Sequence, residues 1–299
     1  MSFKTILVHV DESKQAAECI RIASEIALIE NAHLIGAAMT GVSRYLYRDK
    51  SIVDNDPGLI SHMTFLRDRA ERALQQFEPL AQKIGVSSFE QRVIDDEAAG
   101  GICLQARYSD LVVIGQIDPD APSPTVLSDF PEYVLLNSGR PVLVIPYAGH
   151  FETIGKRILI AWDGSKEATR AVTNAIPFLK RAEIAHVVIF DYDARNDTHG
   201  GQPGADIALY LARHGVKVEV SLHATGINLS RRMVDSKTGE AQQPTGMDIG
   251  NSLLSLTSDM NVDMLVMGGY GHSRFRETML GGVTRTLMQS MTVPVLMSH

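Results

Sequence analysis

A glycine-rich segment near the end of the sequence gives the most direct indication of ligand chemistry. It reads GGYGHSRFRETMLGG from Gly268 to Gly282, and it spaces three glycines as Gly-x2-Gly-x9-Gly at Gly268, Gly271 and Gly281. A glycine has no Cβ, so its backbone can pass close to a bound molecule. Gly281 and Gly282 precede an expected helix, and the free N–H groups and dipole at a helix start attract phosphate. The segment therefore predicts a phosphate site that could hold a triphosphate.

Polar side chains in and after this segment suit the same chemistry. Thr284 adds a hydroxyl to the first turn of the expected helix, and His272, Arg274 and Arg276 lie on the intervening loop, where they could screen phosphate charge. The segment has no Walker-type Lys-Ser or Lys-Thr pair, and glycine-rich turns are common. A flexible loop that leads into a helix is therefore the alternative interpretation.

The sequence contains an internal duplication. The run ILVHVDES at 6–13 returns as ILIAWDGS at 158–165, which is 152 residues later (158 − 6). LVVIG at 111–115 returns as MLVMG at 264–268, and RPVLVIP at 140–146 faces VPVLMSH at 293–299, both with an offset of 153 (264 − 111, 293 − 140). Three apolar runs that recur in the same order with one long period indicate two domains, and not a solenoid.

Each copy alternates expected strands with expected helices. In the second copy, short apolar runs without alternation are typical of strands in a parallel sheet that is covered on both faces; they span residues 157–162, 186–190, 216–222, 263–268 and 293–297. Between the first two runs, apolar residues follow helical spacing from Ala168 to Leu179, with Ser165 as the expected N-cap. The pattern predicts an α/β fold of two tandem doubly wound domains, each a five-stranded parallel sheet flanked by helices. We expect the domains at 1–147 and 155–299.

The expected topology brings two loops of the second copy together. Ligands of parallel α/β sheets lie beyond the carboxyl ends of the strands, at the point where strand order reverses. One loop follows the first strand and carries Asp163-Gly164-Ser165; the other follows the fourth strand and carries the glycines. We therefore expect Asp163 and the glycine segment to form one site.

These motifs resemble the ATP-binding type of the universal stress protein family. The resemblance rests on the Gly-x2-Gly-x9-Gly pattern, the hydroxyl residue after it, the terminal PVL and the opening ILIAWDGS, and it covers both halves, as in a tandem universal stress protein. It implies a five-stranded parallel α/β domain, a stress response, a cytoplasmic location, frequent dimers, and ATP, with Mg²⁺ as its companion, as the ligand. Carried over by position, the adenosine residues are Asp163 and the vicinity of Tyr192, and the phosphate residues are Gly268, Gly271, Gly281, Gly282, Val283 and Thr284.

Two departures from the family pattern bear on the site. Gly282 stands where the family has a serine or threonine, which removes one hydroxyl donor. In the first copy, Asp118 and Asp129 occupy the positions of Gly271 and Gly282, and Pro131 occupies that of Thr284. Carboxylates repel phosphate, and proline removes an N–H from the helix start. We therefore expect a degenerate nucleotide motif in the first domain and a nucleotide site in the second.

Composition narrows the class of protein. The 299-residue chain has a net charge of −7, which argues against a protein whose main task is to hold nucleic acid. Its two cysteines, Cys19 and Cys103, have no metal-type spacing, and a buried thiol in a reducing compartment is the simpler reading of Cys19. No apolar stretch is long enough to span a membrane. We expect no metal site, no nucleic acid partner and no membrane span.

The leading hypothesis is a stress-response protein that binds ATP in its C-terminal domain with little or no turnover, because no general base can be identified. The alternative is a nucleotide-independent scaffold that binds a protein partner, in which the two copies act as a pseudo-dimer within the chain; a homodimer of such chains stays open. An ATP-cleaving enzyme of the same fold class would need a further catalytic motif. A polar insertion at 228–246 is interpreted either as a surface loop or as a lid over the nucleotide.

Overall fold

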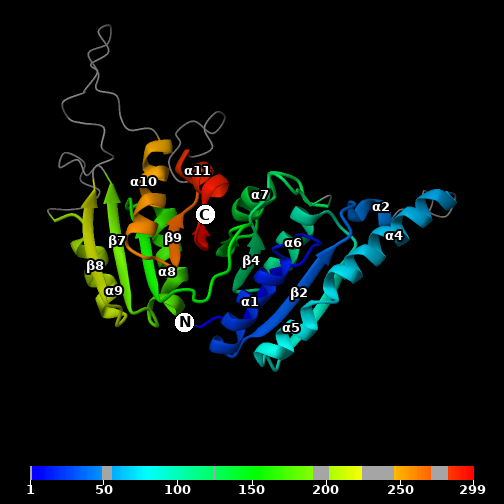
Figure 1. Cartoon of the computed structure of the whole chain (residues 1–299), viewed down its shortest axis with the longest axis horizontal. Coiled ribbons are helices and arrows are strands. Elements are labelled where there is room, and N and C mark those ends of the chain that lie inside the picture. The colour runs from blue at the N-terminus through cyan, green and yellow to red at the C-terminus, as the bar shows by residue number, and fades with distance from the viewer. Residues whose placement is uncertain (1, 49–55, 124, 191–201, 224–245, 271–281) are drawn as a thin grey trace, which may run out of the picture. The chain divides into compact units, whose positions relative to one another are not determined.

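The computed structural model describes residues 2–48, 56–123, 125–190, 202–223, 246–270 and 282–299. The chain divides into two compact units, Met1–His150 and Phe151–Met297 (Figure 1). Each unit is an α/β domain, which confirms the predicted fold class.

The first unit alternates strands and helices. In chain order it contains β1 (Thr5–His9), α1 (Ala16–Glu30), β2 (His33–Met39), α2 (Arg44–Arg48), α4 (Pro57–Leu74), α5 (Phe77–Ile84), β3 (Phe89–Ile94), α6 (Ala98–Ala106), β4 (Leu111–Gly115), α7 (Phe130–Asn137) and β5 (Val142–Ile145). The strands pair in parallel in the order β3-β2-β1-β4-β5. The order reverses at β1, which has β2 on one side and β4 on the other, so a topological switch point lies between β1 and β4.

The second unit repeats this topology. It contains β6 (Arg157–Ala161), α8 (Lys166–Leu179), β7 (Ile184–Phe190), α9 (Ala205–Arg213), β8 (Val218–His223), α10 (Gly246–Asp259), β9 (Met264–Gly268), α11 (Gly282–Ser290) and β10 (Val295–Ser298). Its strand order is β10-β9-β6-β7-β8, and β6 pairs in parallel with β7 and β9. The switch point therefore lies between β6 and β9, as the duplicated sequence predicts.

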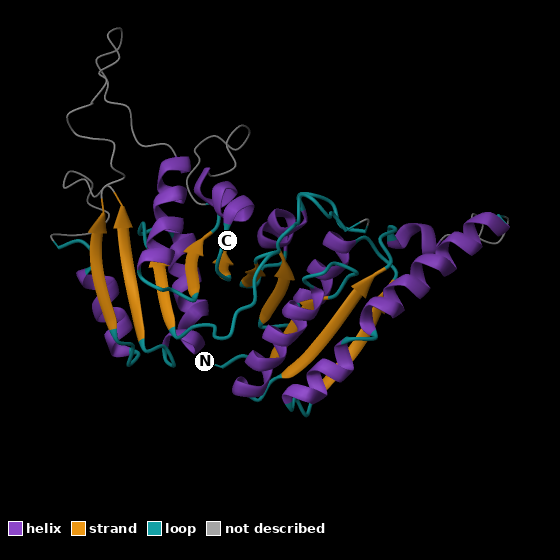
Figure 2. Ribbon diagram, in the orientation of Figure 1, coloured by secondary structure: helices purple, strands orange, loops and turns teal. Residues whose placement is uncertain are grey.

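Helices cover both faces of the first unit's sheet (Figure 2). Gly36 of β2 lies so close under Phe77 of α5 that a Cβ there would come within 2.5 Å of the ring. Met39 of the same strand lies against Gly101 of α6. Residues an odd number of positions apart on a strand point to opposite faces. α5 and α6 therefore pack on opposite faces of β2.

The strands form a core that is buried on both faces. Ile6, Leu7 and Val8 of β1 are successive residues with no exposed surface, and every residue of β5 is buried. The helical stripe of α8 is buried as its spacing predicts, and Ser165 caps this helix by accepting a hydrogen bond from the Ala168 N–H at 3.1 Å. Across the described ranges, every helix is too short or too polar to cross a membrane.

An aspartate that precedes the fourth strand holds the start of the first strand. In the second unit, the Asp263 carboxylate accepts hydrogen bonds from the backbone N–H groups of Gly155, Lys156 and Arg157 at 3.0–3.1 Å. It also accepts one from the Thr153 hydroxyl at 2.8 Å. Hydrogen bonds to a charged acceptor are about twice as strong as neutral ones. Asp263 therefore fixes where β6 begins beside β9.

The first unit uses the equivalent aspartate with fewer donors. Asp110 accepts hydrogen bonds from the backbone N–H groups of Lys4 and Thr5 at 2.7 and 3.0 Å. Both copies of the duplication therefore have this interaction, and the aspartate of the second copy accepts more hydrogen bonds.

We expect Asp263→Ala to lower the free energy of unfolding of the second unit by about 3 kcal/mol, because it leaves three backbone donors without their charged acceptor. Trp162 is the only tryptophan in the sequence and lies in this unit, so its fluorescence during urea denaturation measures the change. Asp110→Ala, the matched control, should leave this transition unchanged and shift the first unit's transition by about 2 kcal/mol. A loss below about 0.5 kcal/mol for Asp263→Ala would contradict the anchoring role.

Candidate functional site

The sheet of the second unit brings two predicted site residues to one edge. β6 and β9 run in parallel with Ile160 opposite Val266 and Ala161 opposite Met267. Asp163 follows β6 by two residues, and Gly268 is the last residue of β9. Both therefore leave the sheet at the carboxyl ends of adjacent strands, at the switch point where α/β proteins bind ligands.

Asp163 is held by a tight local turn. Its Oδ1 accepts a hydrogen bond from the Ser165 backbone N–H at 2.9 Å, and Gly164 between them has a φ of 72°, in the left-handed region that favours glycine. The Asp163 side chain is exposed. The turn therefore presents a carboxylate to solvent at the carboxyl edge of the sheet. The hydrogen bond from the Ser165 N–H fixes the orientation of this side chain relative to the turn.

Gly268 has a packing role that the sequence does not reveal. A Cβ at this position would come within 2.6 Å of the Ala168 backbone N and 2.7 Å of the Glu167 backbone C. Real Cβ contacts essentially never come this close, and backbone atoms cannot rotate away as side chains do. The lack of a side chain at Gly268 therefore lets the first turn of α8 pack against the end of β9.

The start of α11 carries three further predicted site residues. Gly282 is the first residue of the helix and is exposed, Val283 is half-buried, and Thr284 is buried. The Thr284 hydroxyl oxygen accepts a hydrogen bond from the Tyr270 backbone N–H at 3.2 Å. Tyr270 has a φ of 55°, a left-handed conformation that is uncommon for a bulky residue. Thr284 thus secures the chain directly after Gly269 to the first turn of α11.

Several expected site residues lie outside the described residues. They are Tyr192, Gly271 and Gly281, the loop side chains His272, Arg274 and Arg276, and nearly all of the insertion at 228–246. The described part of the site therefore comprises the Asp163 turn, the end of β9 and the first turn of α11.

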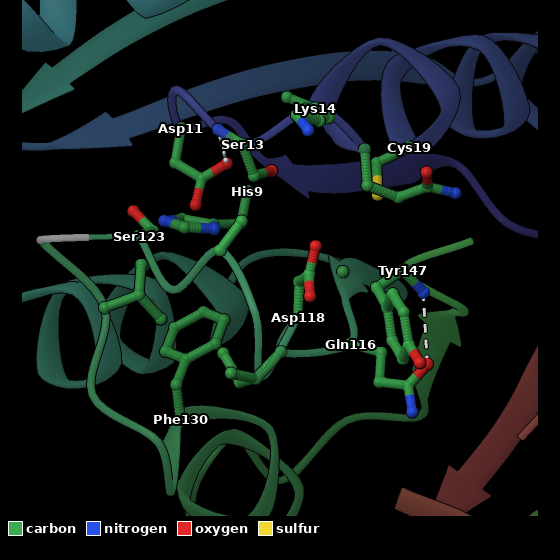
Figure 3. Close-up of a pocket in the computed structure, with 16 residues that line it drawn as sticks. His9, Asp11, Ser13, Lys14, Cys19, Gln116, Asp118, Ser123, Phe130 and Tyr147 are labelled. Atoms are coloured by element: carbon green, nitrogen blue, oxygen red, sulfur yellow. Dashed lines mark hydrogen bonds between the residues drawn. The ribbon is translucent and has the colours of Figure 1, made fainter. Parts of the chain in front are cut away.

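The first unit has a pocket at the equivalent edge of its sheet (Figure 3). Its cavity volume is about 40 Å³, and its walls come from the end of β1 and the turn after it, the start of α1, the segment after β4, the start of α7 and Tyr147 beyond β5. Asp11 repeats the turn of Asp163, since its Oδ1 accepts a hydrogen bond from the Ser13 N–H at 3.0 Å. Gln116 accepts one from the Tyr147 N–H at 3.0 Å through its side-chain oxygen. The first unit therefore has a cavity at this edge although its residues at the phosphate-loop positions differ from those of the second unit.

The sequence analysis did not identify several residues of this pocket, among them His9, Gln116 and Tyr147. His9 is buried and its ring lies 4.7 Å from that of Phe130, centroid to centroid. Burial lowers the pKa of His9, although the charge of Asp11 opposes this effect. Gln116 and Tyr147 come from strand ends 31 residues apart. The available signal was the position of His9 and Gln116 at or just past the ends of β1 and β4.

The helix after this pocket differs from α11 as the sequence predicts. Asp129 is the N-cap residue of α7, and Pro131 and Glu132 lie in its first turn. Two carboxyl side chains and a missing N–H make this helix start a poor anion site.

The described residues of this pocket form neither a reactive cysteine site nor a metal site. Cys19 lines it but is buried, and burial, with the nearby charges of Asp11 and Glu18, raises the pKa of its thiol. A protonated buried thiol is a poor nucleophile. Within the described ranges, no cluster of His, Cys, Asp and Glu side chains could hold a metal ion.

The two equivalent glycines of the duplication allow a matched test of packing. Gly268→Ala should destabilise the second unit by about 2 kcal/mol, because its Cβ would overlap the backbone of α8. Gly115→Ala should be tolerated, because a Cβ there meets only the Cys19 sulfur at 3.6 Å, an ordinary contact. Urea denaturation followed by Trp162 fluorescence measures the first change, and circular dichroism follows the second. Similar costs for both variants would argue against the close approach of Gly268 to α8.

Comparison with known proteins gives one consistent family. The universal stress protein family matches residues 2–146 and again residues 155–299. Universal stress protein Slr1230 of Synechocystis sp. is 21% identical over 271 residues, which cover 90% of this chain and 83% of that protein. The crystal structure of a universal stress protein from Archaeoglobus fulgidus matches with a TM-score of 0.65 and 17% identity, covering 98% of this chain and 94% of that chain.

A second universal stress protein structure from Archaeoglobus fulgidus, a complex with dAMP, is 18% identical and covers 48% of this chain and 98% of that chain, with a TM-score of 0.34. The family match is found once in each half of the duplication and together spans almost the whole sequence. The chain therefore belongs to the universal stress protein family and carries two of its domains in tandem.

Proposed function

We propose that the second domain binds an adenine nucleotide, ATP together with Mg²⁺, at the carboxyl edge of β6 and β9, with little or no turnover. The first domain does not share this ligand. The protein then acts as a nucleotide-responsive member of the stress response in the cytoplasm, where a reducing environment suits its two free, buried cysteines.

The contrast between α11 and α7 carries the proposal. α11 begins at an exposed glycine and has no acidic residue in its first turn. α7, at the equivalent position, has an aspartate as N-cap and a proline and a glutamate in its first turn. The N–H groups and dipole at a helix start attract phosphate only if nearby side chains do not oppose it. The difference favours phosphate at the second site and disfavours it at the first.

Asp163 supports the adenosine side of the proposal. Its exposed carboxylate lies at the same sheet edge as Gly268, and a carboxylate can accept hydrogen bonds from ribose hydroxyls or an adenine amino group. Hydrolysis would also need a general base within hydrogen-bond reach of the attacking water, and we assign none. The proposed role is therefore binding rather than catalysis.

A nucleotide-independent scaffold is the second candidate. It is favoured by the structural roles of two motif residues, since Gly268 accommodates the backbone of α8 and Thr284 bonds the Tyr270 N–H. The fold would need both residues even if no ligand bound. Mass spectrometry of the purified full chain, with extraction of bound small molecules, separates the two: retained adenine nucleotide supports the first, and a protein that neither retains nor binds Mg-ATP supports the scaffold.

We expect Asp163→Ala to weaken Mg-ATP binding by about tenfold or more, because it removes a charged hydrogen-bond acceptor worth roughly 1.5–3 kcal/mol. Trp162 lies next to Asp163, so its fluorescence can follow the titration, with calorimetry as a second measurement. Asp11→Ala is the matched control, since Asp11 forms the same turn in the first domain, and it should leave binding unchanged. Equal losses in the two variants would contradict a single site in the second domain.

Gly282→Ser should tighten Mg-ATP binding by about tenfold, because it adds a hydroxyl donor where a charged phosphate is expected. The backbone permits the change, because Gly282 is exposed and is the first residue of α11, and serine readily adopts a helical conformation. Calorimetric titration of the wild type and the variant measures the difference. Weaker binding in a variant with an unchanged melting temperature would mean that the start of α11 does not contact phosphate.

A further inference from the structure

The pocket of the first domain has a well-defined lining, although the residues at its phosphate-loop positions do not suit phosphate. It lies at the carboxyl edge of β1 and β4, and all the residues that line it belong to the first unit (Figure 3). A cavity of about 40 Å³ is large enough to admit water-sized groups. It can therefore enclose a small molecule, or the head group of a larger one.

The charge of this pocket is opposite to that of a phosphate site. In Figure 3 the Asp11 side chain points toward the segment after β4, and the Asp118 side chain points toward the turn after β1. Each carboxylate accepts a backbone hydrogen bond from its own turn, from the Ser13 N–H at 3.0 Å and from the Asp120 N–H at 2.9 Å. Neither forms an ion pair with any described residue. Both therefore keep acceptor capacity for a cationic group in the cavity.

Other ionisable groups of the pocket do not cancel this charge. Lys14 is the single lysine or arginine among the lining residues, and its side chain is exposed. Burial lowers the pKa of His9, so this imidazole is neutral at neutral pH. The two carboxylates of Asp11 and Asp118 outnumber the single ammonium group of Lys14, so the lining of the pocket has a net negative charge.

Gln15 is an independent indication of a ligand. It lines the pocket, is only 8% exposed, and is the N-cap residue of α1. Its side-chain nitrogen is buried and has no hydrogen-bond partner in the part of the chain that the structure describes. Native proteins rarely leave a buried amide donor without an acceptor, because its desolvation is not compensated. An acceptor on a bound molecule would satisfy it.

We propose that the first-domain pocket binds a small organic amine that also carries a hydrogen-bond acceptor. The ammonium group faces Asp11 and Asp118, and the acceptor, a hydroxyl or carbonyl oxygen, faces Gln15. The His9 and Phe130 rings, whose centroids are 4.7 Å apart, form an aromatic wall beside the carbon atoms of the ligand. The two domains of the chain would then bind ligands of opposite charge with the same scaffold, and this inference does not depend on nucleotide binding by the second domain.

Ethanolamine and ethylene glycol provide a matched pair of probes, because they have the same size and differ by a charged amine in place of a hydroxyl. Ligand-observed NMR with the full chain should detect saturable binding of ethanolamine, and ethylene glycol should bind at least tenfold more weakly. Equal binding of both probes, or no binding of ethanolamine, would overturn the proposal.

Two variants assign the binding to this pocket. Asp118→Asn keeps the acceptor for the Asp120 N–H but removes the charge, and it should weaken ethanolamine binding by about tenfold. Asp120→Asn, two residues away on an exposed side chain that does not line the pocket, is the control and should have no effect. Unchanged binding in a folded Asp118→Asn variant would contradict the assignment.

A third variant tests the buried amide. Gln15→Met should weaken ethanolamine binding severalfold without lowering the melting temperature, because the amide donor has no partner to lose. A clear drop in melting temperature without loss of binding would mean that Gln15 serves the fold and not the ligand.

The nucleotide and amine sites are tested separately by crossing the variants. Asp163→Ala should leave ethanolamine binding unchanged, and Asp118→Asn should leave Mg-ATP binding unchanged. Displacement of ethanolamine by AMP would instead identify the first pocket as a nucleotide site and overturn the proposal.

Discussion

Asp263 accepts hydrogen bonds from three successive backbone N–H groups at the start of β6, and this interaction sets the geometry of the second domain. It determines which residue of β6 lies beside which residue of β9. A shift of one residue would turn the buried side chains of β6 toward the other face of the sheet. The same register places the Asp163 turn next to Gly268 at the carboxyl edge. Asp110 repeats the interaction in the first domain, so both sites depend on one kind of carboxylate anchor.

The duplication keeps the scaffold and changes the chemistry of the edge. Strand order, parallel pairing and the aspartate turn after the first strand are the same in both domains. The start of the last helix differs, because α7 carries carboxylates and a proline where α11 carries a glycine and a threonine. Main-chain hydrogen bonds and buried apolar residues maintain the sheet, whereas residues at its edge are free to vary. One fold can therefore present edges that differ in charge and in hydrogen-bonding groups.

Motif residues of the second domain serve packing as well as any ligand. Gly268 has no room for a Cβ because the backbone of α8 lies against it, and the Thr284 hydroxyl bonds the Tyr270 N–H. The equivalent of Gly268 in the first domain is Gly115, which has room for a methyl group. A glycine in a binding motif can thus be required by the approach of a helix, and the pattern alone does not distinguish this role from the approach of a ligand.

The sequence by itself determined the features that depend on local pattern and on repetition. Apolar runs and helical spacing predicted the strands and α8, Ser165 was expected as a cap, and the offset of 152–153 residues predicted two like domains. Pro131 and Asp129 predicted the altered helix start of the first domain, since a proline or carboxylate acts on its own turn.

Only the tertiary structure decided which distant residues meet. The contact of Gly268 with Ala168 joins positions 100 residues apart in the sequence (268 − 168), and neither residue type indicates its partner. The pocket of His9, Gln15, Gln116 and Tyr147 likewise arises because the ends of β1, β4 and β5 converge at one edge of the sheet. Periodicity is written along the chain, whereas cavities and close approaches depend on how separate elements pack.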